Sequence, residues 1–350
     1  MIKKTIKKII NRKKVDDSPS RITNGTIDEH REEVLSKGRK FKYPLQYAKN
    51  KLIINTVVLS TITIAAVSVF GWVQMYKVQN TSDIAYRVTQ FIPLNVAKVD
   101  GKGVLYSDYL MQLRSSITVI ERQSGKLDDS EDSKRQMEYY KRIALDNSEV
   151  SAYVMKLAKE LDIKIDRERI KTVFNEHRDA GGVEVTEKNF IKIINDNYGL
   201  SRSEYERMFI ELPLLRQEVQ VRIDDDAKDI VKRLEAALKS DGSNFDLVSG
   251  EFAKNEQVSI EPSGGLVSSV SNLDGGRAAK AYSLEKNRVS EPFLSKSGDS
   301  YYIVKTINKQ DDKVEYISIR VSLTELRRRI DQLRSDGKIE EYIKIDMQTE

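Results

Sequence analysis

The sequence contains no cysteine and only two histidines, His30 and His177. The chain therefore has no disulfide framework, no thiol nucleophile and no thiolate metal site. Two isolated histidines also exclude a metal site built on clustered imidazoles. His177 lies near Glu176 and Asp179, but carboxylates on a charged helix are normally solvated, so we expect no metal and no cofactor. A chain of 350 residues, 39% of them hydrophobic, is long enough for two or three domains with ordinary cores.

The charge is distributed unevenly along the chain. Residues 1–51 hold 15 basic and 6 acidic residues, a net charge of +9, whereas the remainder holds 44 basic and 48 acidic residues, a net charge of −4. The basic character of the protein therefore belongs to its N-terminal tail. No aromatic or fold-level signal accompanies this charge, which argues against a nucleic-acid partner.

A long uncharged segment follows the basic tail. The 25 residues from Leu52 to Tyr76 contain no ionisable side chain except the final tyrosine. A helix of this length spans about 37 Å, enough to cross a hydrocarbon core of about 30 Å. A buried helix of a soluble domain rarely stays uncharged for so long, and a signal peptide has a much shorter apolar core. We therefore predict a retained transmembrane helix over residues 52–76.

The flanking charges predict the orientation of this helix. Basic residues crowd the segment before it, whereas Lys77 and Arg87 are the only basic residues shortly after it. The positive-inside rule then places residues 1–51 in the cytoplasm and residues 77–350 outside the cell membrane. Residues 1–14 show isoleucines on one helical face among lysines and could lie on anionic lipid, or they could be a disordered tail. We interpret residues 15–50 as a flexible linker.

The sequence after the predicted membrane helix indicates a polar tether over residues 77–93, followed by two regions. Residues 94–223 predict a strand, a turn at Asp100–Gly101, a second strand and then a series of helices. A helix starting at Ser133, a helix cap at Thr186 and a bend at Pro213 are among the expected features. This region is almost wholly helical.

Residues 224–312 change in character. One amphipathic helix and one short helix precede segments rich in glycine, serine and β-branched residues, which predict strands and turns. Residues 313–350 add a strand, a helix with a capping box at Ser322–Glu325, and a second possible strand. The fold class is therefore α+β.

Several segments carry a resemblance to a known family. They are VAKVDGKGVLYSDYL (96–110), ALDNSEVSAYVMKLAKELDIKI (144–165), YGLSRSEYERMF (198–209), NFDLVSGEFAKN (244–255), GGLVSSV (264–270) and KAYSLEKNRVSEPFLSKSGDSYYIVKTI (280–307). Together they resemble the SurA/PrsA class of membrane-associated or secreted folding factors over roughly residues 94–310. The resemblance implies a helical chaperone domain over 94–223 and a parvulin-type (PpiC) peptidyl-prolyl isomerase domain over 224–312.

The resemblance also implies a proline-binding pocket, and this chain departs from it. Parvulins line that pocket with two histidines and an apolar group of Leu, Met and Phe, but no histidine follows His177 here. The last-strand histidine position falls on Tyr302, the methionine position on Leu273 and the phenylalanine position on Arg277, while Leu266 keeps the leucine. A charge at the phenylalanine position opposes binding of a proline ring.

Four residues are accordingly the candidates for binding a polypeptide: Leu266, Leu273, Tyr282 and Tyr302. We expect no catalytic residue and little or no isomerase activity. The first strand of the parvulin sheet is hard to find, because only VQVRI (219–223) precedes Asp224. The strand EYISIRV (315–321) is a candidate to replace it by completing the sheet from the other end of the chain.

These observations predict an anchored, extracytoplasmic folding chaperone that binds unfolded or extended polypeptides. The predicted binding surface is an apolar groove between the helical and α+β regions. Two alternatives stay open at this point: an active peptidyl-prolyl cis-trans isomerase with a rebuilt pocket, and a non-catalytic adaptor of the cell envelope.

Overall fold

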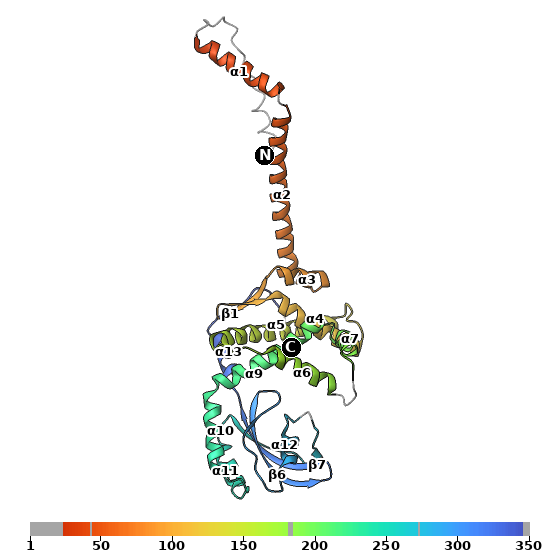
Figure 1. Cartoon of the computed structure of the whole chain (residues 1–350), viewed down its shortest axis with the longest axis vertical. Helices are drawn as coiled ribbons and strands as arrows, with labels where there is room; N and C mark the ends of the chain where they lie inside the picture. The colour runs from red at the N-terminus through yellow and green to blue at the C-terminus, as the bar shows by residue number, and fades with distance from the viewer. Residues whose placement is uncertain (1–23, 43, 181–184, 272–273, 346–350) are drawn as a thin grey trace. The chain divides into compact units, whose positions relative to one another are not determined.

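The computed structural model describes residues 24–42, 44–180, 185–271 and 274–345. The chain divides into two compact units at Val73 and Gln74. The second unit combines helices with antiparallel sheets, so the predicted α+β class is confirmed (Figure 1).

The first unit is helical. The helices are α1 (Asn24–Lys42) and α2 (Pro44–Tyr76), the latter ending within the second unit. The prediction of a flexible linker over residues 15–50 is wrong where the structure describes this segment, because part of it forms α1. This helix contains many good helix formers and an i,i+4 ion pair between Glu33 and Lys37. Residues 1–14, with their predicted lipid face, lie outside the described residues.

Helix α2 contains the predicted membrane span. Lys51–Tyr76 is long and apolar enough to cross a membrane, and its side chains from Lys51 to Phe70 are exposed. Polar hydroxyls within it are satisfied locally, since Thr56, Thr61 and Thr63 donate to carbonyls four residues earlier. These three hydroxyls therefore do not need water as a hydrogen-bond partner.

The second unit begins with a helical lobe. Its helices are α3 (Asp83–Phe91), α4 (Tyr106–Ser124), α5 (Glu131–Glu160), α6 (Arg167–Asp179), α7 (Glu187–Tyr198), α8 (Arg202–Tyr205), the π-helical segment η3 (Glu206–Glu211) and α9 (Leu212–Ile223). Side-chain caps at Asp166, Thr186 and Ser201 fix the starts of α6, α7 and α8. Ser130, and not the expected Ser133, caps α5.

A small sheet joins the two ends of this unit. The strands β1 (Asn95–Val99) and β2 (Lys102–Leu105) form the predicted hairpin, and β8 (Ile339–Glu341) pairs with β1. Helix α13 (Glu325–Ser335) packs into the same core through Leu326, Ile330 and Leu333. The strand, helix and strand predicted over residues 313–350 are β7 (Lys313–Ser322), α13 and β8, and the last two belong to the helical lobe.

The second lobe is built on an antiparallel sheet. Its strands are β3 (Val258–Pro262), β4 (Val267–Ser268), β5 (Phe293–Leu294), β6 (Ser300–Gln310) and β7 (Lys313–Ser322), in the order β3-β7-β6-β5 with β4 also on β7. Strand β7 pairs with both β3 and β6 and so is central. The prediction that residues 315–321 complete this sheet is confirmed.

Different helices cover the two faces of this sheet. Helices α10 (Asp225–Ala237) and α11 (Phe245–Phe252) pack against one face, where Ile303, Ile319 and Val321 are buried. Helix α12 (Arg277–Ser283) packs against the other face, beside Val304 and Tyr316. The alternation along β6 and β7 sends successive side chains to these two cores.

One further prediction is corrected. The polar tether over residues 77–93 contains α3, whose Ala85, Tyr86 and Thr89 are buried. Residues 219–223, where a first parvulin strand was hard to find, are the end of α9.

Candidate functional site

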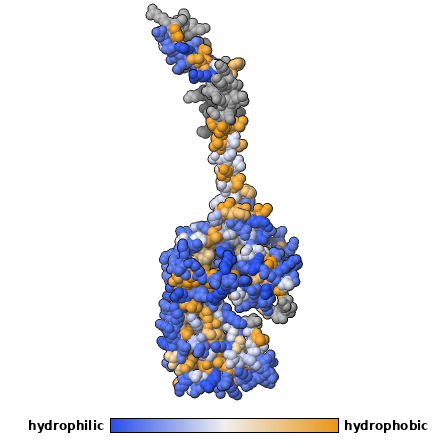
Figure 2. Space-filling view, viewed as in Figure 1, coloured by the Kyte–Doolittle hydropathy of each residue, from blue (hydrophilic) through white to orange (hydrophobic). Residues whose placement is uncertain are grey.

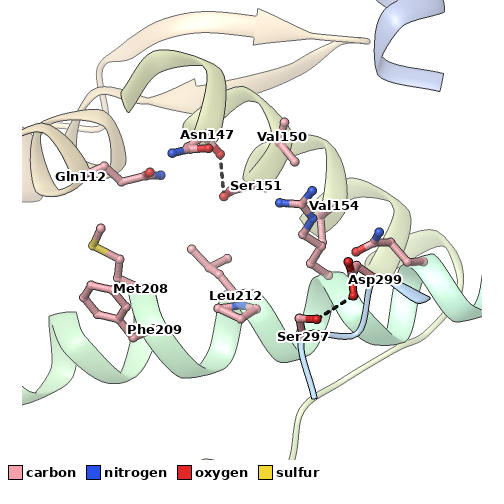
Figure 3. Close-up of a pocket in the computed structure, with 13 residues that line it drawn as sticks. Gln112, Asn147, Val150, Ser151, Val154, Met208, Phe209, Leu212, Ser297 and Asp299 are labelled. Atoms are coloured by element: carbon pink, nitrogen blue, oxygen red, sulfur yellow. Dashed lines mark hydrogen bonds between the residues drawn. The ribbon is translucent and has the colours of Figure 1, made fainter. Parts of the chain in front are cut away.

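A groove lies between the helical lobe and one loop of the sheet lobe. Its volume is about 440 Å³. The apolar wall comes from α5, η3 and α9, and consists of Val150, Val154, Met208, Phe209, Leu212 and Pro213. Ser297 and Asp299 close the groove from the loop before β6 (Figure 3).

The spacing of residues explains the apolar wall. Val150 and Val154 are four residues apart on α5 and therefore lie on one face of that helix. Val154 is buried, whereas Val150 and Met208 are partly exposed to the groove. Met208 is unbranched and adapts its shape to different apolar partners. The wall is thus partly rigid and partly adaptable.

The π-helical turn positions Met208 and Phe209. Within it the Leu212 N–H donates to the Arg207 carbonyl, five residues back. Pro213 comes directly after Leu212 and has no N–H to donate. The backbone hydrogen bond that residue 213 would otherwise make to the preceding turn is therefore missing. The bend predicted at Pro213 therefore takes the form of a widened turn that borders the groove.

Phe209 belongs to a larger group of aromatic rings. Its ring centre lies 5.0 Å from that of Tyr205 and 5.1 Å from that of Tyr198. Tyr205 in turn contacts Phe174, Phe190 and His177. This packing restrains Phe209, which is partly exposed and lines the groove.

His177 takes part in this packing. Its Nδ1 lies 3.1 Å from the Tyr205 hydroxyl, and burial lowers the pKa of the imidazole. Among the described residues no group of three or more His, Asp or Glu side chains is placed to hold a metal.

Polar side chains line the rest of the groove. They are Gln112, Asn147, Ser151, Arg216 and Gln220. Gln112 is held in place by a hydrogen bond from its Nε2 to the Ser148 hydroxyl, 3.1 Å away. Ser151 donates to the Asn147 carbonyl (Figure 3). Amide and hydroxyl groups of this kind suit the hydrogen-bonding groups of a polypeptide backbone.

The loop that closes the groove is fixed by Asp299. Its carboxylate accepts hydrogen bonds from the hydroxyls of Ser295 and Ser297, at 2.7 and 2.6 Å, and from Arg320 at 2.8 Å. Burial works against ionisation, but the two serine hydrogen bonds and the charge of Arg320 outweigh it and lower the pKa of Asp299. Asp299 is therefore an anion that anchors the loop to β7.

Two of the positions that the resemblance assigns to a proline pocket, Arg277 and Tyr302, contact each other and their neighbours in the sheet lobe. The Arg277 guanidinium lies 4.7 Å from the ring centre of Tyr302, which is 5% exposed. Arg277 also pairs with Glu261 and donates to the Asp274 carbonyl and the Ser318 hydroxyl. These contacts connect α12 to the strands β3, β6 and β7.

Two of the four predicted binding residues, Tyr282 and Tyr302, are not brought together in the structure. The Tyr282 hydroxyl donates to the Asp311 carbonyl at the β6–β7 turn, whereas Tyr302 lies at the other end of β6. Leu266 is 37% exposed ahead of β4. Leu273 lies outside the described residues. Their role in binding stays a prediction.

The sequence predicted a groove between the helical and α+β regions but not the residues that line it. Pro213 and the apolar face with Val150 and Val154 were visible signals of the local structure. The contribution of Gln112 and of the loop with Ser297 had no sequence signal, because it depends on how the two lobes of the second unit pack.

Comparison with protein-family models finds no match for this chain, and comparison with curated proteins finds none either.

Proposed function

We propose that the protein is a membrane-anchored, extracytoplasmic chaperone of the SurA/PrsA type, which binds unfolded exported polypeptides in the groove between α5, η3 and α9. The observation that carries this proposal is the groove itself, with an apolar wall that includes Met208 and Phe209 and a polar wall that includes Gln112. An unfolded chain offers apolar side chains and unpaired backbone groups, and both find partners on such a surface.

The anchor would be the segment Lys51–Tyr76 of α2. Its length and apolar composition suit a membrane span, and the positive charge before it favours a cytoplasmic N-terminus. The groove would then lie on the outer side of the membrane, where newly exported chains are unfolded. No nucleic-acid partner and no cofactor form part of the proposal.

The alternative of an active isomerase is less well supported. Catalysis of prolyl isomerisation requires a pocket that accepts the ring and stabilises the twisted amide. The positions that the resemblance assigns to that pocket hold Arg277 packed on Tyr302, and the guanidinium is paired with Glu261. We propose that this lobe contributes to binding and to the shape of the groove, and has no isomerase activity.

The test uses the full chain in lipid nanodiscs and the variants Val150→Glu and Met208→Glu, which place a charge on the partly exposed side of the apolar wall. We expect both to lose most of their ability to suppress aggregation of two unrelated unfolded proteins. Ile193→Glu is the matched control, since Ile193 is 43% exposed on α7 and does not line the groove.

Three outcomes would contradict the proposal. Groove variants that fold normally and still protect both clients would remove the groove from the mechanism. Activity towards a single folded partner, and none towards unfolded clients, would favour the adaptor. Faster proline-limited refolding of a client in the presence of the wild-type chain would favour the isomerase.

The absence of cysteine gives a direct test of orientation. The variants Ser36→Cys, in the first unit, and Ser335→Cys, in the second, each introduce one cysteine at an exposed position. A membrane-impermeant maleimide can label each of these cysteines. We expect labelling of intact cells only at the second position, and at the first only after the membrane is opened. The reverse pattern would overturn the proposed orientation, and cleavage of the chain ahead of Gln74 would overturn the retained anchor.

A further inference from the structure

The short helix α3 exposes apolar side chains on the face that points away from the protein core. Its core side carries Ala85, Tyr86 and Thr89. The exposed apolar residues are Ile84, Val88, Phe91 and the following Ile92, at 76%, 43%, 85% and 53% exposure. Ile84, Val88 and Phe91 are spaced i, i+4 and i+7 and so form one stripe along the helix. Figure 2 shows hydrophobic surface at this segment.

Several contacts fix the orientation of α3. The Tyr86 hydroxyl donates to Glu204, and the Arg114 guanidinium lies 4.8 Å from the Tyr86 ring centre. Arg114 also pairs with Asp83 in the first turn, and Ser82 caps the helix by accepting from the Ala85 N–H. The apolar stripe therefore lies on a helix whose orientation is fixed by side-chain contacts.

The end of α2 is attached to the same unit. The Tyr106 hydroxyl donates to the Met75 carbonyl at 2.6 Å, and the Tyr76 hydroxyl donates to the Asn95 carbonyl at 2.8 Å. The side chain of Met75 is 4% exposed. The point at which the chain leaves the apolar segment is thus fixed on the second unit.

The chain between these two features is short. Six residues separate Tyr76 from Asp83. The seven steps between their Cα atoms can span at most about 25 Å, less than the thickness of a bilayer. If α2 crosses the membrane, α3 must lie within that distance of the place where α2 emerges.

We propose that the stripe of Ile84, Val88, Phe91 and Ile92 lies in the outer interface of the phospholipid bilayer, next to the membrane span. This inference rests on the anchor in the proposed function. Continuity with α2 favours lipid over a protein partner, because the bilayer surface is the one apolar phase that chain connectivity brings to α3. The exposed Arg87 beside the stripe suits lipid phosphates. A second membrane contact would restrain the unit from rotating about α2 and hold the groove in a fixed orientation to the membrane.

The experiment places a fluorescent reporter on α3 of the full chain. The sequence has a single tryptophan, Trp72, so a Trp72→Phe background is free of tryptophan emission. Phe91→Trp is then the reporter, and Tyr139→Trp is the control at a 52%-exposed position on α5. Both are reconstituted in phosphatidylcholine–phosphatidylglycerol vesicles, with and without lipids brominated on their acyl chains.

We expect the bromolipids to quench the Phe91→Trp emission about twofold or more and to leave the control nearly unchanged. A reporter that floats with the vesicles and is quenched no more than the control overturns the surface contact while leaving the anchor in place. A chain that does not float with the vesicles overturns the anchor, and the surface contact falls with it. Adding Ile84→Asp and Val88→Asp to the reporter should abolish the quenching without releasing the chain from the vesicles.

Discussion

The guanidinium of Arg277 stacks on the ring of Tyr302, 4.7 Å from its centre, on the sheet face that α12 covers. The same guanidinium pairs with Glu261 on β3. Burial opposes the charge of Glu261, but the hydrogen bonds from Arg277 and Ser259, together with the charges of Arg277 and Arg320, outweigh it and lower the pKa of this carboxyl. One arginine thus connects α12, β3 and β6.

We predict that Arg277→Leu destabilises the chain by about 1–3 kcal/mol. The change removes a shielded cation–π contact and several hydrogen bonds at once. Urea unfolding of the full chain in detergent micelles, followed by near-ultraviolet circular dichroism, measures the effect. Arg327→Met is the control, because the Arg327 side chain is 89% exposed and should tolerate the change within about 0.5 kcal/mol. Equal stability of the two variants would mean that the Arg277 contacts contribute nothing net.

Asp224 supports the second prediction, because it caps two helices that are far apart in the sequence. Its Oδ1 accepts from the Ala227 N–H at 3.0 Å, while its Oδ2 accepts from the N–H groups of Thr324 and Glu325 at 2.7 and 3.0 Å. The residue is 2% exposed. Removing this carboxylate leaves a buried N–H donor without its partner at the start of α10 and two partly buried donors without theirs at the start of α13.

We therefore predict a loss of about 3 kcal/mol for Asp224→Ala and a smaller loss for Asp224→Asn, whose single carbonyl oxygen can satisfy only part of the set. Asp226→Ala is the control, since Asp226 is exposed in the first turn of α10. Thermal and urea unfolding should rank the variants in that order. A loss for Asp224→Ala as small as that of the control would show that water replaces the carboxylate.

Local signals in the sequence were sufficient for many helices of the second unit. Asp166 and Thr186 both cap helices through hydrogen bonds to nearby N–H groups, and Gly199 ends α7 in the left-handed conformation. These features depend on residues within one or two turns, so the sequence contains all the information needed. The hairpin over Asn95–Leu105 was predictable for the same reason, since its turn lies at Asp100–Gly101.

Contacts between distant segments could not be predicted in the same way. The pairing of β8 with β1 joins Ile339 to Val99, and the capping box expected at Ser322–Glu325 is replaced by Asp224 from the start of α10. Strand pairings and helix caps of this kind depend on which backbone groups the rest of the fold leaves unpaired. The lining of the groove could not be predicted for the same reason, because Ser297 reaches the groove only through the packing of the two lobes.

The last prediction concerns Glu149, which is buried between α5, α13 and β8. Its Oε2 lies 3.2 Å from Arg334 Nη2 on α13, and its Oε1 lies 3.9 Å from Arg142 Nη2 on α5. Asp146 on α5 and Glu341 on β8 add negative charge nearby. Burial first, and then the charge of Glu341, raise the pKa of Glu149 to about 7, with the two arginines opposing the shift.

A raised carboxyl pKa means that the folded state binds this proton more tightly than the unfolded state, in which the pKa is about 4.5. The contribution of protonated Glu149 is fully present below about pH 4.5 and is lost as the pH rises through about 7. We predict that Glu149→Gln, which keeps a neutral side chain at every pH, removes this dependence. Relative to wild type, the variant should gain about 2–3 kcal/mol between pH 5 and pH 8.

The measurement is the urea midpoint of the full chain in micelles at several pH values between 5 and 8. Comparison with wild type cancels the contributions of the other carboxylates, many of which have the opposite slope. Glu340→Gln on β8 is the control, because Glu340 is exposed and should leave the slope unchanged. Parallel curves for Glu149→Gln and wild type would show that Arg142 and Arg334 keep Glu149 ionised throughout, and that the attachment of α13 and β8 to α5 does not depend on this proton.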